Sequence, residues 1–277
     1  MAPCLSHLSK NKSCRGRAPF SGLKSMANIS SYIICATPRS GSTLLCDLLS
    51  ETGVAGQPHS YYRQQDILDW ARGWGVPLPD ASHRTAFDRS YLAAVLRAGS
   101  SENGVFGIRL MLGSVADLCT RLRGLYPDLH DEASLFERAI GTTLYIHLSR
   151  QDKIGQAVSR LRAEQSGLWH VSADGTERER TSPPLPVVYD AGRLSSYLTE
   201  LETDDAAWAT FFKRNRIEPL ALTYETMVAA PQVVLAGILS ALGLDPEVAA
   251  TVDVKTAKLA DQTSLEWADR FRVESGR

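Results

Sequence analysis

Residues 32–50 read YIICATPRSGSTLLCDLLS, and this stretch decides the fold. Residues 32–35 form a short apolar run that is typical of a buried strand. A small polar turn follows at residues 37–43, and leucines then recur at the spacing of a helix. A strand, a tight turn and a helix in this order direct backbone N–H groups and a helix N-terminus at one point. That point favours a bound phosphate or sulfate.

The turn is not a Walker A nucleotide-binding motif, because that motif needs a lysine and residues 37–49 contain none. Arg39 is the only cation of the turn, and Gly41 permits close approach of the backbone to a ligand. Ser42 and Thr43 offer hydroxyl groups, which could instead cap an ordinary helix. Without the lysine–serine/threonine pair of that motif there is no obvious handle for Mg²⁺, which disfavours nucleoside triphosphate chemistry.

The composition is that of an ordinary globular protein. The chain has 277 residues, 44% of them hydrophobic and 22% charged, which fits one large domain or two small ones. No apolar run reaches the ~18 residues of a membrane helix, so no transmembrane segment is expected. The five cysteines show no metal-binding spacing. They indicate reduced thiols and therefore a cytoplasmic protein.

Charge is distributed unevenly along the chain. Residues 1–29 hold five of the 30 basic residues and no acidic ones, so the remaining 25 basic residues face 31 acidic ones and the net charge is −6. Such a body is not expected to bind nucleic acid, and it must hold a polyanionic ligand with a few local cations. Residues 1–29 are predicted to be disordered. They are either an organellar transit peptide or the result of a start site assigned too far upstream, in which case Met26 is the true initiator. Residues 30–277 are predicted to form the single folded domain.

Strand-like and helix-like segments alternate in the rest of the chain. The predicted strands are residues 104–110, 142–148 and 217–224, and the predicted helices are residues 115–125, 152–166, 194–214 and 233–242. This alternation predicts an α/β fold with a parallel sheet covered on both faces. Residues 77–84 and 175–186 are predicted loops, the second being either a substrate lid or a solvated connection.

Polar residues that follow predicted strands are the first candidates for a site, because ligands of open α/β sheets bind at the carboxyl ends of the strands. Arg39 follows the first strand and Arg150 the third. Ser159 lies about two turns, roughly 10 Å, along the next helix. Arg150 and Ser159 could grip a second phosphate. Alternatively, Arg150 forms a surface ion pair with Asp152 and Ser159 is an ordinary polar position of a helix.

Four segments together resemble a known family: CATPRSGSTLLCDLL (35–49), GVAGQP (53–58), VFGIRLM (105–111) and HLSRQDKIGQAVSRLRAEQSGLW (147–169). In this order they resemble bacterial carbohydrate sulfotransferases of the trehalose 2-sulfotransferase type, to which lipopolysaccharide and nodulation-factor sulfotransferases are similar. The resemblance extends over residues 30–272. It implies a P-loop-like parallel sheet flanked by helices, forming one sulfotransferase domain.

The resemblance also implies the chemistry and the residues of the site. Such enzymes move a sulfuryl group from 3′-phosphoadenosine 5′-phosphosulfate to a sugar or glycolipid hydroxyl, need no metal and form homodimers. The 3′-phosphate would be bound by Arg150 and Ser159. The 5′-phosphosulfate loop would consist of Thr37, Pro38, Arg39, Ser40, Gly41, Ser42 and Thr43.

One segment departs from the family pattern. Relatives carry a glutamate as general base at the position of Ser60 and commonly a second acid at that of Gln57, but residues 56–62 read GQPHSYY. His59 is the only group there whose ordinary pKa suits a base near neutrality, so we expect it to take the proton of the acceptor. Alternatively, His59 only lines the sugar site. The fallback carboxylates are Glu51 and Asp66.

The same departure leaves the acceptor open, since losing two acids changes how sugar hydroxyls are held. A glycolipid, an oligosaccharide or another hydroxylated metabolite is as compatible with the sequence as trehalose. Expected acceptor contacts are Gln57, Ser60, Tyr61 and Arg109. Aromatic residues that could stack on sugar rings, or simply belong to the core, are Tyr61, Tyr62, Trp70 and Trp74. A tail at residues 258–271 could cover the nucleotide through Lys258, Gln262 and Ser264, or be a solvated helix face.

Two other functions remain compatible with the sequence. A P-loop kinase or other phosphotransferase would need ATP and Mg²⁺, against which the missing lysine argues. A non-catalytic relative would bind the nucleotide without transferring sulfate, which the missing glutamate would explain.

Overall fold

The computed structural model describes residues 29–79, 83–171, 176–253 and 261–277. The predictions for residues 1–28 and for Lys258 lie outside the described residues, as do residues 80–82 of the predicted loop 77–84. Residues 77–79 and 83 lie outside helices and strands, and Arg84 begins a helix.

A parallel sheet forms the centre of the fold. In the described part of the chain its four strands are ordered β2-β1-β3-β6, and every neighbouring pair is parallel. Their bounds are Phe106–Met111 (β2), Ser31–Ala36 (β1), Thr143–Ser149 (β3) and Leu220–Thr223 (β6). All six residues of β1 are buried, as expected for a strand between two parallel neighbours with helices on both faces. The predicted α/β fold is therefore confirmed.

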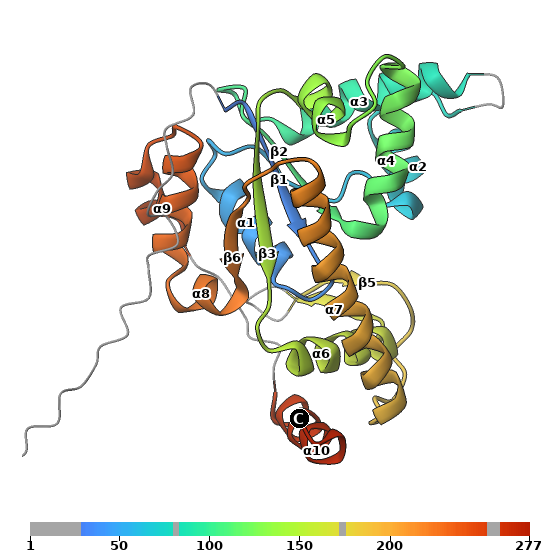
Figure 1. Cartoon of the computed structure of the whole chain (residues 1–277), viewed down its shortest axis with the longest axis vertical. Coiled ribbons are helices and arrows are strands. Elements are labelled where there is room, and N and C mark those ends of the chain that lie inside the picture. Colours follow the sequence, from blue (N-terminus) through green and yellow to red (C-terminus); the bar gives the residue numbers. More distant parts are fainter. Residues whose placement is uncertain (1–28, 80–82, 172–175, 254–260) are drawn as a thin grey trace, which may run out of the picture.

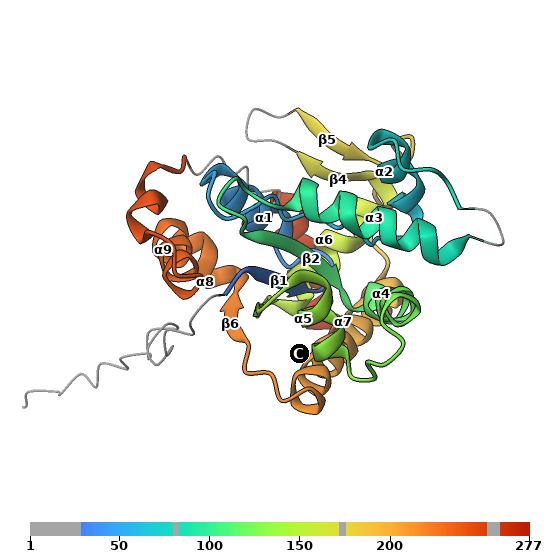
Figure 2. The same cartoon turned by 90° about the horizontal axis from the view of Figure 1, so that it is seen from above.

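Helices cover both faces of the sheet (Figures 1 and 2). One face of β1 packs with α1, α8, α9 and the short helix η2, and the other with α2, α3, α4, α5 and α7. Their bounds are α1 Ser42–Glu51, α2 Ile67–Gly73, α3 Arg84–Gly99, α4 Leu112–Leu125, α5 Glu132–Ile140, α7 Ala191–Arg214, α8 Tyr224–Ala229, α9 Pro231–Ala241 and η2 Pro246–Thr251. A second short helix, η1, spans Gln64–Asp66.

Two helices and a hairpin lie beyond the carboxyl ends of the strands (Figure 1). Helix α6 (Lys153–Ser166) follows β3, and helix α10 (Gln262–Ser275) packs against it. The hairpin joins β4 (Leu168–Val171) to β5 (Glu177–Arg180) in antiparallel pairing. These elements form the far wall of the region in which a ligand of such a sheet is expected.

The prediction of an unstructured segment at residues 175–186 is wrong in part, because β5 lies within it. Residues 177–180 read ERER and lack the apolar alternation by which a strand is recognised. Side chains hold the hairpin instead, since Trp169 Nε1 donates to Thr181 Oγ1 at 3.1 Å and Arg180 Nη1 donates to the Ser166 carbonyl at 2.7 Å. Gly167 (φ 70°) is the C-cap of α6, and Trp169 and His170 follow it in β4.

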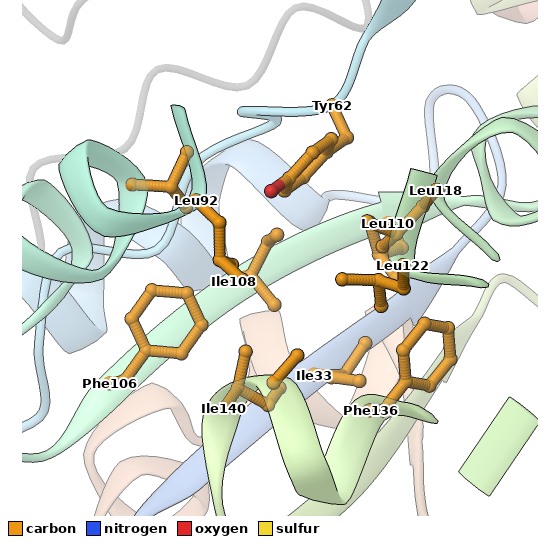
Figure 3. Close-up of a pocket in the computed structure, with 12 residues that line it drawn as sticks. Ile33, Tyr62, Leu92, Phe106, Ile108, Leu110, Leu118, Leu122, Phe136 and Ile140 are labelled. Carbon is orange, nitrogen blue, oxygen red and sulfur yellow. The ribbon is translucent and has the colours of Figure 1, made fainter. Parts of the chain in front are cut away.

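The apolar layer between the sheet and α3, α4 and α5 is tightly filled. Figure 3 shows Ile33, Ile108 and Phe136 around its small remaining pocket, whose volume is ≈ 10 Å³. Such a volume is about that of a single water probe, and the lining is apolar. This pocket is therefore part of the core. In the described ranges no helix combines the length and the hydropathy that crossing a membrane requires.

Trp208 attaches α7 to the end of β1. Its side chain is 1% exposed, and its indole Nε1 donates to the Ala36 carbonyl at 3.1 Å. Its ring stacks on Phe212 at 5.7 Å between centroids. Because Ala36 directly precedes the 37–43 turn, this contact fixes the point at which the chain leaves the sheet.

We expect Trp208→Phe to lower the free energy of unfolding by about 1–3 kcal/mol, because it leaves the buried Ala36 carbonyl without its donor. Urea unfolding followed by circular dichroism measures the change. Thr210→Ala, an exposed change on the same helix, is the matched control and should alter stability by less than about 0.5 kcal/mol. Equal stabilities of the two variants would contradict the assigned role of Trp208.

Candidate active site

A large cleft opens at the carboxyl ends of the strands. Its volume is ≈ 2370 Å³, and residues of the 37–43 turn, the 57–63 segment, α6, the hairpin, α8 and α10 line it. The structure therefore brings the predicted donor and acceptor residues to one cavity. Thr37 and Ser40 are the exceptions within the turn, since both are buried and neither lines the cleft.

The turn has the backbone of an anion-binding loop. Arg39 and Gly41 both lie in the left-handed region, with φ of 62° and 86°. Gly41 is the N-cap of α1, and no side chain caps this helix, so the first-turn amides are left for a ligand. A Cβ on Gly41 would lie 2.5 Å from Tyr224 Cδ2, which explains glycine at this position. The alternative of an ordinary serine-capped helix is therefore wrong.

Arg39 turns back from the loop toward α6 and β4. Its Nε donates to Ser159 Oγ at 3.0 Å, and its Nη1 donates to the Trp169 carbonyl. Burial, together with the nearby charge of Arg150, lowers the pKa of Arg39 to about 10. Arg39 and Ser159 are thus in direct contact. A bound anion would relieve the repulsion between the two guanidinium groups.

Arg150 lies beside the turn and lines the same cleft as Ser159. Its Nη1 donates to the Arg39 carbonyl at 3.4 Å, and its guanidinium stacks over the Tyr224 ring at 4.8 Å. The alternative of an ion pair with Asp152 does not describe the structure, because Asp152 caps α6 by accepting from Gly155 N and also accepts from Arg272.

Gln156 is a residue that the sequence analysis missed. It is fully buried, and its Nε2 donates to Thr37 Oγ1 at 3.0 Å and to the Pro38 carbonyl at 2.7 Å. Gln156 and Ser159 are three positions apart on α6, so one face of this helix holds the first three residues of the turn. That spacing was the available signal.

Arg109 connects the turn to the acceptor side of the cleft. Its Nε donates to Ser60 Oγ at 2.8 Å, its Nη1 donates to Thr43 Oγ1 at 2.7 Å, and its amide donates to the His59 carbonyl at 3.1 Å. One guanidinium therefore fixes both segments that are expected to hold the two substrates.

His59 faces the cleft and is exposed there. Its ring lies edge-on to Trp70, with centroids 5.0 Å apart. Partial burial, together with the charges of Arg109 and Arg63, lowers the pKa of His59 to about 4. The imidazole is consequently neutral at physiological pH and retains a lone pair that can accept a proton.

Of the other residues predicted to contact the acceptor, some are exposed in the cleft and others are buried behind it. Gln57 is exposed in the cleft, whereas the Tyr61 ring is 4% exposed and its hydroxyl donates to the Gln57 carbonyl at 2.6 Å. Tyr62 is buried in the core against Tyr91, so it does not stack on a sugar. Trp70 lines the cleft and stacks on Trp74 at 5.0 Å.

The hairpin contributes a carboxylate that the sequence analysis did not consider. Glu179 Oε1 accepts from Arg63 Nη1 at 2.9 Å, and Oε2 lies 3.4 Å from His170 Nε2. His170 Nε2 in turn lies 3.1 Å from Thr43 Oγ1. Partial burial raises the pKa of Glu179, but the hydrogen bond and charge of Arg63, with His170 and Arg109, outweigh it, so the pKa lies below its ordinary value.

The remaining candidates occupy the edges of the cleft. Glu51 and Asp66 both line it, and Asp66 is bound by Arg63. Ser264 accepts from Arg162 at the start of α10, where Gln262 bonds to Glu266. In the described part of the chain, no cluster of three or more His, Cys, Asp or Glu could hold a metal ion.

The donor end of the cleft fits a doubly phosphorylated nucleotide. The Arg150 guanidinium donates to the Arg39 carbonyl in the turn that precedes the uncapped start of α1. In addition, Arg150 Nε is buried without a hydrogen-bond partner among the described residues. Phosphate oxygens are acceptors, and this orphaned N–H group can donate to them.

Comparisons with known proteins bear on this geometry. The family model of Stf0 sulphotransferases matches residues 31–274. A trehalose 2-sulfotransferase of Mycobacterium tuberculosis is 30% identical over 264 residues, covering 89% of this chain and 96% of its own. A trehalose 2-sulfotransferase of Mycolicibacterium smegmatis is also 30% identical, over 267 residues with the same coverage.

One solved structure is a more distant match. The sulfotransferase domain of the Synechococcus PCC 7002 olefin synthase is 16% identical, with a TM-score of 0.44 and coverage of 90% of both chains. The family-model match and the two curated relatives extend over the whole sheet and the cleft. The chain belongs to the Stf0 sulfotransferase family and is a sulfotransferase.

Proposed function

We propose that this sulfotransferase moves a sulfuryl group from 3′-phosphoadenosine 5′-phosphosulfate to a hydroxyl of a sugar or glycolipid. The observation that carries the proposal is the contact of Arg39 with Ser159 and of Arg150 with the Arg39 carbonyl, in the turn that leads into the uncapped helix α1. Two phosphate groups on one adenosine need two adjacent cationic positions, and the neighbouring acceptor segment supplies the second half of the cleft.

The residues of the turn bind the donor and stabilise charge. The transferring group carries developing negative charge on its peripheral and leaving oxygens, as in phosphoryl transfer. Arg39 and the α1 amides lie at the end where that charge is released, and Arg109 lies between the donor loop and Ser60. Preorganised donors of this kind cost no reorganisation during the reaction. Ser159 and Arg150 bind the 3′-phosphate.

His59 is the proposed proton acceptor. Its imidazole is neutral over the physiological range, because its pKa lies at about 4. The proton of the attacking hydroxyl passes to the imidazole as the new O–S bond forms. The bond between sulfur and the bridging phosphate oxygen breaks in the same step, and adenosine 3′,5′-bisphosphate leaves with that bonding electron pair. Gln57, Ser60 and Tyr61 shape the acceptor side, Tyr61 by holding the Gln57 backbone. The acceptor is a trehalose-like sugar or a larger glycolipid. A cytoplasmic location and a homodimer are further parts of the proposal.

A transfer assay with ³⁵S-labelled donor against a panel of neutral sugars, oligosaccharides and glycolipids tests the function. We expect label on at least one hydroxylated acceptor, without added metal. Binding of the nucleotide with no transfer to any acceptor would instead favour the non-catalytic alternative.

Arg150→Gln is expected to weaken binding of adenosine 3′,5′-bisphosphate by about 10- to 100-fold, because a charge-assisted contact contributes about 1.5–3 kcal/mol. Isothermal titration calorimetry in the presence of a chelator measures it. Arg72→Gln, an exposed change on α2, is the control and should bind like the parent. A preference of the parent for ATP–Mg²⁺ would favour the kinase alternative.

His59→Gln is expected to lower kcat by about 10²- to 10⁴-fold with nucleotide affinity unchanged. Protonation removes the lone pair, so parent kcat/KM should stay level from pH 8 to near pH 5 and fall as the pH approaches the pKa of about 4. His130→Gln, an exposed change, should alter neither quantity. Turnover retained in His59→Gln would refute this role.

A further inference from the structure

Glu179 places a carboxylate close to the 37–43 turn. It lies on the β4–β5 hairpin, across from the 37–43 turn, and its side chain is 28% exposed. Through His170 it is two side-chain contacts away from Thr43, at 3.4 and 3.1 Å. Arg39, Arg63 and Arg109 are all close enough to interact electrostatically with it. The carboxylate is therefore ionised at the junction of the donor and acceptor halves of the cleft.

An ionised carboxylate at this place has to accept hydrogen bonds. Arg63 satisfies Oε1 at 2.9 Å, whereas the contact of Oε2 with His170 is long at 3.4 Å. The phosphosulfate group of the donor cannot satisfy Oε2, since phosphate and sulfate oxygens are acceptors and carry negative charge. The hydroxyl groups of an acceptor are donors, and they are the chemistry that fits this oxygen.

The acceptor segment lacks such a group of its own. Residues 56–62 contain no carboxylate, and the Ser60 hydroxyl is already bonded to Arg109. The hairpin brings Glu179 to the same cleft from a segment more than a hundred residues later in the chain.

We propose that Glu179 binds the acceptor, accepting a hydrogen bond from a hydroxyl other than the one that is sulfated. This rests on the proposed function and deepens it. A negative charge at this position selects a neutral polyol over an acceptor that carries a carboxylate or sulfate beside the reacting hydroxyl. The substrate class is therefore a neutral sugar with at least two free hydroxyls within reach of the cleft.

The test uses Glu179→Gln in the full chain. Glutamine retains a carbonyl oxygen that can accept from Arg63, so the hairpin keeps its anchor while the charge is lost. We expect KM for the neutral acceptor to rise at least about tenfold, since a charged hydrogen bond is lost. We expect kcat to change less than threefold and nucleotide affinity less than twofold. Glu177→Gln on the same strand, where Glu177 pairs with Arg180, is the matched control and should behave like the parent.

A second readout separates binding from a structural role. The neutral sugar is compared with its uronic acid counterpart, and the parent should prefer the neutral sugar. In Glu179→Gln that preference should shrink at least about tenfold, because repulsion of the anionic acceptor is removed. If Glu179 serves only to anchor the hairpin, Glu179→Gln should instead lower activity equally with both acceptors, or lower both the nucleotide affinity and the melting temperature.

The outcomes distinguish this inference from the proposed function. If the parent transfers sulfuryl groups but Glu179→Gln has the parent's KM and acceptor preference, the role of Glu179 is wrong and the function stands. A fall in kcat with KM unchanged also overturns it, because Glu179 would then take part in proton transfer. If the parent transfers to no acceptor and binds no nucleotide, the proposed function itself fails.

Discussion

The contact between α6 and the turn after β1 is the constraint on which the site depends. Gln156, fully buried, donates to two oxygens of the turn, and Ser159 accepts from Arg39. These bonds keep Arg39 in a left-handed conformation that is costly for a residue with a side chain. They also keep its guanidinium near that of Arg150, where burial and repulsion lower its pKa to about 10. The free protein thus stores an unfavourable pair of charges that an anion can neutralise.

The sheet and the donor loop were predictable because their signals are local. The apolar run before the turn, the leucines after it and the periodic face of α6 each lie within one window of sequence. Arg150 was predictable since the carboxyl ends of parallel strands meet at one edge. Its role as a ligand of the 3′-phosphate stays a prediction, as does the division of the chain at residue 30.

The residues that were missed owe their position to tertiary contacts. Gln156 looks like a polar surface position of a helix, yet it is buried because the turn lies against that face. The β5 strand has an alternating charge pattern and no apolar face. Its position is fixed by pairing with β4 and by the hydrogen bond from Arg63 to Glu179. Tyr62 directly follows Tyr61, which lines the cleft, but its own side chain is buried in the core. No pattern in the chain distinguishes it from Tyr61.

Arg109 shows why the changed acceptor segment is compatible with transfer. Its guanidinium bonds to the hydroxyls of Ser60 and Thr43, at 2.8 and 2.7 Å, and these groups are neutral. The family resemblance implies a glutamate at the position of Ser60, which would neutralise this cation by pairing with it. With serine there, the positive charge stays available between donor and acceptor, where charge develops on the transferring group. A carboxylate that offsets the charge of Arg109 is then best placed at some distance from it. Glu179 of the hairpin is such a group, and it contacts Thr43 of the turn only through His170.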